Sequence, residues 1–282
     1  MVLESLINPF KAEKKPYEMF FIGLVYSSIA IMLTLWVFDE GKSMAFVFLT
    51  VIAAIPMIYN TLKIEERKDL QIQNEGKLLK EHSKALSFFL FMFLGFLVSF
   101  VLWNLFLPGS VSQELFFNQE QTISRINRLV TSGSFFSPIL GLILSNNIKV
   151  LFFRILFSFF YGAGAIFIFT WNASVIALAI GNFFRAELSM ITSTLGLTGV
   201  SAYFKAGTTT LLRYMVHAIP EIVAYFIAGM AGGIISVAIA RHDFRTKNFQ
   251  KIVLDSSNLI LIALAFLIVA AILEVYVTPL LF

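Results

Sequence analysis

The sequence predicts an all-α fold: a polytopic bundle of about seven transmembrane helices, with an amphipathic helix at the membrane interface. Three observations predict this class. The chain is 58% hydrophobic and only 13% charged, about half the charge of an average soluble domain. Several charge-free runs exceed the roughly 18 residues that suggest a membrane helix, and the mean hydropathy is +0.84. Basic residues gather in short segments between these runs, as expected where they fix the orientation in the membrane.

Residues 1–84 are predicted to form an N-terminal module of two membrane helices and a charged linker. The first span covers residues 19–38 and the second covers residues 43–62, with Gly41 breaking the turn between them. Residues 63–84 contain six Lys and Arg residues among acidic ones. This mixture predicts a solvated helix or linker, and its basic residues place it on the cytoplasmic side.

Residues 85–282 are predicted to form a core of five further spans. The third span of the chain ends near Pro108. Residues 109–145 then space their apolar side chains as an amphipathic helix does, among polar and charged ones. We expect this helix to lie at the outer interface or to pack under the bundle.

The next two spans are predicted to form a hairpin. Residues 155–184 carry no charge, and as one helix they would be about 45 Å long, more than a bilayer core of about 30 Å. We therefore predict two spans between about residues 147 and 190, with a turn near residues 170–174. Residues 191–210 are rich in Gly, Ser and Thr, which predicts an external loop or a re-entrant segment.

The last two spans are predicted at residues 211–240 and 257–276, with a basic loop at residues 241–255 between them. Seven spans place the N-terminus and both basic loops in the cytoplasm and the C-terminus outside. We therefore expect a multi-pass protein of the cell membrane.

Composition also limits the function. The net charge of +4 follows from the basic loops, so we expect no nucleic-acid partner. The chain has no cysteine, which excludes disulfides, thiolate metal sites and cysteine nucleophiles. We expect no cofactor. The expected partners are the lipid bilayer and either further copies of the chain or other membrane proteins.

Small residues recur on one face of the sixth predicted span. We call this set the ridge: Ala224, Ala228, Gly229, Gly232, Gly233 and Ser236. Residues four apart stack along a helix, and in lipid such a stripe marks where another backbone comes close. That neighbour is either another helix of the chain or the second protomer of a homodimer.

Polar residues at the head of the same span predict an intramembrane site. His217 and Glu221 share one helix face with the ridge, and Pro220 between them removes a backbone hydrogen bond. A carboxylate at this depth costs several kcal/mol unless it is paired, protonated or hydrated. The partner that we expect is Arg154, and the other polar residues in reach are Asn146, Asn147 and Asn172. The set predicts either a buried structural network or a polar path for a solute.

Enzymatic activity is not expected. His217 and Glu221 supply two zinc ligands, whereas catalytic zinc needs at least three from the protein. The other histidines, His82 and His242, fall in the predicted cytoplasmic loops. No HExxH or GxSxG motif and no intramembrane Asp occurs. We predict no catalytic residue and no metal ligand.

The order of these features resembles the stage II sporulation protein M family. The matching positions are Asn146, Asn147, Gly162, Gly164, Asn172, His217, Glu221, Gly229 and Gly232. The resemblance implies five spans with a cytoplasmic N-terminus over residues 85–282, preceded by two added spans. In spore-forming bacteria the founding member resembles a membrane scaffold that recruits cell-wall-degrading partners. Because relatives occur widely outside spore formers, the resemblance implies the fold rather than the sporulation role.

Two functions follow from the sequence. The first is a non-enzymatic scaffold or subunit of a membrane complex, in which the ridge builds a dimer or holds a partner. The alternative is a small-ion or solute transporter or channel, in which Glu221 and His217 line a polar path. A path should recruit more polar side chains than the few available here, which favours the scaffold.

Overall fold

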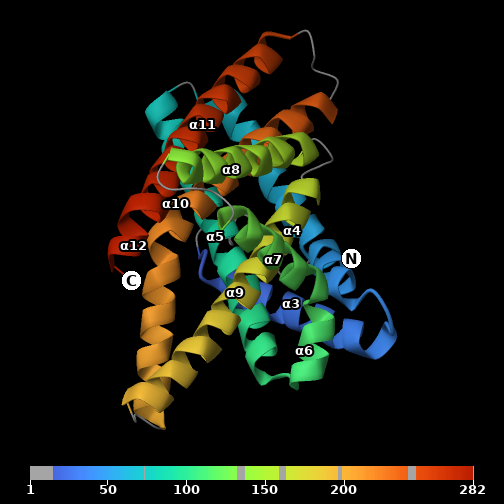
Figure 1. The fold of residues 1–282 in the computed structure, drawn as a ribbon. Coiled ribbons are helices and arrows are strands. Elements are labelled where there is room, and N and C mark those ends of the chain that lie inside the picture. Colours follow the sequence, from blue (N-terminus) through green and yellow to red (C-terminus); the bar gives the residue numbers. More distant parts are fainter. Residues whose placement is uncertain are drawn as a thin grey trace.

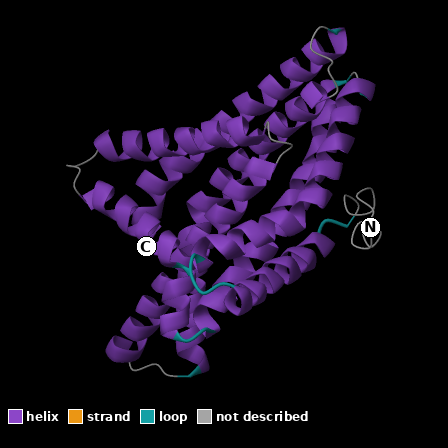
Figure 2. Ribbon diagram, turned by 90° about the vertical axis from the view of Figure 1, so that its right-hand side faces the viewer, coloured by secondary structure: helices purple, strands orange, loops and turns teal. Residues whose placement is uncertain are grey.

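A computed structural model describes residues 15–72, 74–131, 137–158, 163–195, 199–240 and 246–281; a few side chains within these ranges lie outside the description. All regular elements in this part of the chain are helices (Figure 1, Figure 2). They are α3 (Glu18–Val37), α4 (Lys42–Gln71), α5 (Glu75–Phe106), α6 (Gly109–Leu115), α7 (Phe117–Thr131), α8 (Ser137–Ser158), α9 (Ala163–Leu195), α10 (Val200–Ala240), α11 (Lys247–Ile272), the π-helix η1 (Leu273–Val277) and α12 (Thr278–Leu281). Seven of them are long and apolar enough to cross a membrane, which confirms the predicted fold class.

α10 is the central helix of the bundle. Its apolar segment is 78% buried, against 17% to 50% in the other six spans. It packs against α11, α8, α9, α4 and α5. The whole ridge is buried inside the chain. A Cβ added to Gly233 would lie 2.6 Å from Cδ1 of Leu62, so the close neighbour at this point of the ridge is α4 of the same chain.

The first two helices share one hydrophobic core with the rest of the bundle. Met19 of α3 and Phe46 of α4 belong to the same buried cluster as Phe226 of α10. Phe46 also meets Phe100 of α5 edge to face, with ring centroids 5.1 Å apart. The two helices that we predict as an N-terminal module are therefore packed as part of the bundle.

A close approach between backbones joins α3 and α5. A Cβ added to Gly95 would meet the carbonyl oxygen of Phe20, and one added to Gly23 would meet that of Met92. A glycine from each helix therefore lies in the contact, as in close crossings of membrane helices. Each of these glycines is followed four residues later by a serine, Ser27 in α3 and Ser99 in α5. This is the small-residue spacing of close helix contacts, but it is too short a repeat to stand out as the ridge does.

Replacing Gly95 with leucine is expected to lower the free energy of unfolding by about 1–3 kcal/mol or more, because the side chain would push α3 away from α5. Thermal unfolding in detergent, followed by circular dichroism, measures this effect. Gly141 of α8 provides the control, because a Cβ there meets nothing within 4 Å. Equal melting of Gly95→Leu and Gly141→Leu would contradict the prediction.

The polar segment after α5 forms two helices that pack against the bundle. α6 and α7 replace the single amphipathic helix that we predict within residues 109–145. Gln119 of α7 is buried, and its Nε2 donates to the carbonyl of Ser43 and to Oγ of Ser174, both at 3.1 Å. These bonds tie α7 to α4 and α9, as in the packed alternative.

The predicted turn near residues 170–174 is wrong. These residues lie inside α9, and the break between α8 and α9 falls after Ser158 and before Ala163. Inside α9 the hydroxyls of Thr170 and Ser174 donate to backbone carbonyls one turn back, at 2.9 and 2.7 Å, so the helix satisfies both polar groups. α9 has 33 residues, about 50 Å of helix, so it extends beyond a bilayer core of about 30 Å.

α8 also begins earlier than predicted. It starts at Ser137, so Asn146 and Asn147 lie inside the helix and do not cap it. In Figure 1 α8 runs across α10 and α11, and it packs against both of them and against α9.

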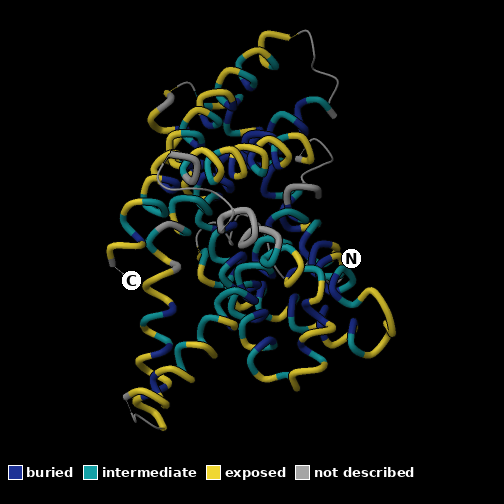
Figure 3. The backbone as a smooth tube through the Cα atoms, in the orientation of Figure 1, coloured by how far each residue is buried: buried dark blue, intermediate teal, exposed yellow. Residues whose placement is uncertain are grey.

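The described parts of residues 191–210 are helical and do not form the predicted loop or re-entrant segment. They are the end of α9 and the start of α10, which we call the hairpin. α9 continues to Leu195, and α10 begins at Val200 directly after Gly199, whose φ of 65° favours glycine. Ile191 packs against two small residues of α10, Ala202 and Ala206, which lets the helices lie close. The hairpin extends from the bundle at the lower left of Figure 3, with much of its surface exposed.

The described part of residues 63–84 follows the helical alternative of the prediction rather than the linker, but several of its charged side chains are buried and not solvated. This part forms the end of α4 and the start of α5 and carries what we call the His82 cluster: Glu65, Lys68, Asp69 and His82. His82 Nδ1 lies 2.7 Å from Oε2 of Glu65, and Nε2 lies 2.9 Å from Oδ1 of Asp69. Lys68 Nζ lies 2.6 Å from the other oxygen of Glu65. The charges can be buried because they pair with one another across the α4–α5 turn.

α11 closes this end of the bundle. Lys251 Nζ donates to the carbonyl oxygens of Asp69 and Ile72, at 2.6 and 2.8 Å. These carbonyls belong to the last turn of α4, where a cation is favoured by the helix dipole.

The orientation of the bundle remains a prediction with a direct test. Lys77 lies at the His82 end and Gln113 at the α6 end, and both are exposed. Cysteines introduced at these two positions, in a chain without native cysteine, are expected to react with a membrane-impermeant maleimide from opposite sides. Labelling of Gln113→Cys in intact cells and of Lys77→Cys only after lysis would support a cytoplasmic His82 cluster. Labelling of both from one side would contradict the topology.

Candidate functional site

Arg154 of α8 is almost completely buried, with 1% of its surface exposed. Its guanidinium carbon lies 4.3 Å from the ring centroid of Phe169 of α9 and 4.0 Å from that of Tyr225 of α10. Cation–π contacts of this kind are each worth about 2 kcal/mol when desolvated. Nε and Nη1 have no hydrogen-bond partner among the described residues. Two aromatic rings, one from α9 and one from α10, therefore hold this cation.

Glu221 lies one turn before Tyr225 on α10, and its side chain is half-buried. It interacts electrostatically with Arg154. The structure thus brings together the two charged residues of the predicted site, with Tyr225 as an additional neighbour of both. A direct ion pair between Arg154 and Glu221 stays a prediction.

The end of α11 brings a second carboxylate to the same place. Glu274 interacts electrostatically with Glu221 and Tyr225. It lies in η1, where one turn is widened by an extra residue, and Oγ1 of Thr278 donates to the carbonyl of Leu273 at 3.1 Å. We call Arg154, Glu221, Tyr225 and Glu274 the Arg154 group.

The remaining predicted residues are less closely gathered. Asn147 is buried, and its Nδ2 has no hydrogen-bond partner among the described residues. Asn146 is exposed on α8, and Asn172 is half-buried on α9. The backbone of His217 lies in α10 one turn before Glu221, but its side chain is outside the described residues, as is Gly162. In the described part of the chain no three His, Cys, Asp or Glu side chains gather to hold a metal.

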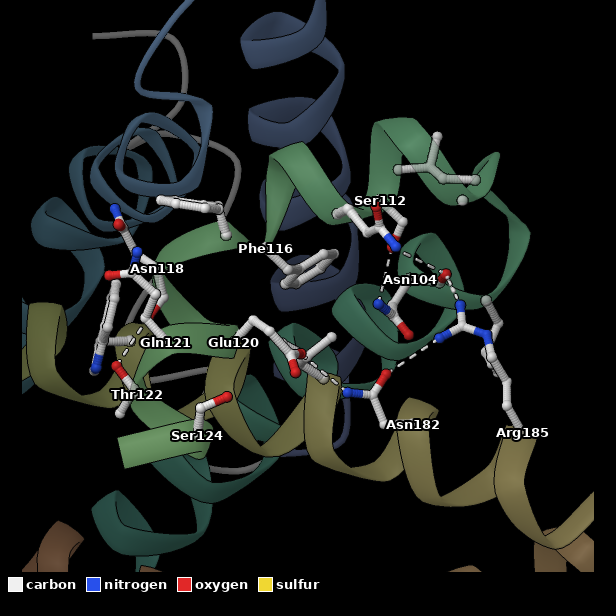
Figure 4. A pocket seen from close by; sticks show the side chains of 17 residues that line it. Asn104, Ser112, Phe116, Asn118, Glu120, Gln121, Thr122, Ser124, Asn182 and Arg185 are labelled. Atoms are coloured by element: carbon white, nitrogen blue, oxygen red, sulfur yellow. Dashed lines mark hydrogen bonds between the residues drawn. The ribbon is translucent and has the colours of Figure 1, made fainter. Parts of the chain in front are cut away.

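A cavity of about 1760 Å³ opens between α5, α6, α7 and α9 (Figure 4). We call it the α7–α9 cavity. Its walls combine aromatic rings with amide and charged side chains, among them Phe117, Glu120, Gln121, Trp171, Asn182 and Arg185. Clefts of this mixed composition are typical of binding sites.

Hydrogen bonds order one wall of the α7–α9 cavity. Asn182 Nδ2 of α9 donates to Oε2 of Glu120 on α7 at 3.1 Å, and Arg185 Nη1 donates to Oδ1 of Asn182 at 3.4 Å (Figure 4). Arg185 Nη2 also donates to the backbone carbonyl of Asn104, at the end of α5. The row Arg185–Asn182–Glu120 thereby links three helices.

Two of these features, Glu274 and the α7–α9 cavity, were not predicted from the sequence. Glu274 could have been found, because an acidic residue within an apolar span indicates function by default. The α7–α9 cavity could not, because its walls come from helices whose predicted boundaries were wrong. Asn182 and Arg185 share a face with Trp171 only when α9 is one continuous helix.

Comparison with known families identifies the chain. The family described as stage II sporulation protein M matches residues 44–279. The match begins within the second span, earlier than residue 85, where the motifs predicted the family region to start. This earlier start agrees with the finding that α4 shares one hydrophobic core with the later helices. Searches of curated proteins and of solved structures find no match. Because the match covers most of the chain and the chain forms the expected all-helical membrane bundle, the protein belongs to the stage II sporulation protein M family.

Proposed function

We propose that this protein is a non-enzymatic scaffold of a membrane complex, and that the outer half of α10 docks a helix of a partner membrane protein. One observation carries the proposal. A stripe of α10 with spacings of four and three residues faces away from α9. We call it the α10 seam: Phe204, Thr208, Leu211, Met215 and Ala218. This spacing is that of a coiled-coil contact.

The α10 seam is uncovered although it is largely apolar. Phe204, Leu211 and Met215 are 75%, 53% and 49% exposed. The opposite side of the same helix is used inside the chain, since Ala202 and Ala206 are buried against α9. The seam is therefore an exposed contact face on a helix whose opposite side packs against α9.

Lipid does not account for the whole seam. α10 has 41 residues, about 61 Å of helix, whereas a bilayer core takes about 20 residues. An apolar segment long enough to cross the bilayer lies within residues 218–239. Phe204 precedes Ala218 by 14 residues, about 21 Å along the helix, so it reaches past the hydrocarbon. An occupant that follows the seam into the bilayer has to be helical and membrane-bound.

The interior gives less support to a transporter. The ridge was predicted as a possible contact for a partner, but all of its residues are buried within the chain. Where α10 passes α4, α5 and α9, the void lined by Ile58, Phe89 and Gly229 has about 10 Å³, at the lower limit for a single water. Among the described residues, the guanidinium of Arg154 stacks on the rings of Phe169 and Tyr225.

Site-specific photo-crosslinking in the native membrane tests the scaffold. With benzoylphenylalanine at position 204, we expect one discrete adduct with a membrane protein. Leu211→Ser should remove this adduct, because the change breaks the seam two turns away. Leu212→Ser is the matched control: it is 52% exposed but turned by about 100° from Leu211, and it should preserve the adduct.

Three outcomes would count against the proposal. Equal loss in Leu211→Ser and Leu212→Ser would show that the seam is not the contact. An adduct of twice the mass of the chain would replace the partner with a second copy of this protein. Solute flux into proteoliposomes that is abolished by Glu221→Gln, with the fold intact, would favour the transporter.

A further inference from the structure

The α7–α9 cavity presents aromatic and amide side chains on two facing helices. α9 contributes Trp171, Asn182 and Arg185, which share a face at spacings of eleven and three residues. α7 contributes Phe117 and Gln121, one turn apart and both exposed. Each wall therefore carries an aromatic ring beside side chains that form hydrogen bonds.

The polar row of the cavity matches hydroxyl groups. Glu120 only accepts hydrogen bonds, Arg185 only donates them, and Asn182 between them does both. A hydroxyl also both donates and accepts hydrogen bonds. Neighbouring hydroxyls of one ligand can therefore donate to Glu120, accept from Arg185, and do either with Asn182. The bonds among the three side chains, at 3.1 and 3.4 Å, fix their orientation before a ligand arrives.

The charges that line the cavity do not favour a charged ligand or a metal ion. Among the described residues, its lining has one cation, Arg185, and one anion, Glu120, and this balance favours a neutral ligand. Arg185 is also engaged by the carbonyl of Asn104 and by Asn182. A metal is not favoured, because no suitable group of three ligands occurs in the described part of the chain.

The volume of the cavity and its aromatic rings narrow the class of ligand further. About 1760 Å³ exceeds the roughly 300–1,000 Å³ of ordinary small-molecule sites, so a short oligomer fits better than a single small solute. The apolar C–H face of a sugar ring packs on an aromatic side chain, while its hydroxyls reach the surrounding polar groups. Trp171 and Phe117 supply such rings on opposite walls.

We propose that the α7–α9 cavity is a carbohydrate site that binds a short segment of a neutral glycan. The sugar rings pack against Trp171 and Phe117. Their hydroxyls bond to Gln121 and to the Glu120–Asn182–Arg185 row. The site is independent of the α10 seam, so either can exist without the other.

Binding of neutral tetrasaccharides to the full chain in nanodiscs tests the site. The probes are cellotetraose and N-acetylated chitotetraose, measured by calorimetry and by tryptophan fluorescence. We expect at least one to bind with saturation, and Asn182→Ala and Gln121→Ala each to weaken it at least tenfold. Gln250→Ala is the matched control, since it removes an exposed amide of α11 far along the chain from the cavity, and it should leave the dissociation constant unchanged.

Two further measurements make the outcome decisive. Circular dichroism melting has to show that Gln121→Ala, which removes an exposed side chain, remains folded. A tetragalacturonate probe and an uncharged tetrapeptide test an acidic glycan and a peptide. The proposal is overturned if neither neutral tetrasaccharide saturates, if binding is the same in Gln121→Ala and Gln250→Ala, or if only the acidic glycan or the peptide binds.

Discussion

Replacing His82 with alanine is expected to lower the free energy of unfolding by about 3–5 kcal/mol, because it leaves two buried carboxylates without their shared cation. Glu65 and Asp69 are 0% and 1% exposed. Each ring nitrogen of His82 faces one of them, at 2.7 and 2.9 Å. A protonated ring suits both carboxylates: Nδ1 forms a hydrogen bond with Glu65, whereas Nε2 lies within ion-pair distance of Asp69 without forming one. Chemical unfolding in mixed micelles, followed by circular dichroism, measures the loss.

Glu81→Gln is the control for the His82 cluster. Glu81 is also acidic and pairs with Lys84 and Lys68, at 2.5 and 3.8 Å, but its side chain is 31% exposed. Exposed pairs of this kind contribute only about 0–1 kcal/mol. An equal loss of stability in His82→Ala and Glu81→Gln would show that burial of the cluster does not matter to the fold.

Replacing Arg154 with glutamine is expected to destabilise the protein by a similar amount, about 3–5 kcal/mol. The change removes the cation from the Arg154 group and leaves Glu221 and Glu274 facing each other. It also removes the stacking on Phe169 and Tyr225. Glu221→Gln alone should destabilise less than Arg154→Gln, because the guanidinium keeps its stacking on Phe169 and Tyr225.

A double-mutant cycle separates these contributions. If Arg154 and Glu221 are coupled, the double change to glutamine should recover much of the loss caused by Arg154→Gln. Arg154→Lys keeps the charge but not the planar group that stacks on the rings, so its stability should be intermediate. Strictly additive effects of the two single changes would remove the proposed coupling. The same unfolding assay serves for the unchanged chain and for all four variants.

The number of spans was predictable because each apolar run is a local property of the sequence. Lipid requires about 20 apolar residues in a row whatever the rest of the fold does. Helix boundaries were less predictable, because they depend on how each polar side chain is satisfied. Thr170 and Thr208 bond to carbonyls one turn back, both at 2.9 Å, and so remain in helices that their composition did not favour.

Long-range pairing explains the other errors. The charged residues 63–84 look solvated in sequence because nothing local shows that Glu65 and Asp69 face His82. Glu221 and Arg154 were named because each stands out in an apolar segment, and they do lie close together. Phe169 and Tyr225, which hold the guanidinium, resemble any other aromatic residue of a membrane helix.

The π-helix η1 carries an evolutionary consequence. A turn of this kind accommodates one residue more than an α-helix, and one residue corresponds to about 100° of rotation. Deleting a single residue within Leu273–Val277 would restore regular α-helix at this turn. The side chains of α12 would keep their orientation, because the wide turn takes up the extra residue. Homologous sequences are therefore best aligned with an allowed one-residue gap at this point.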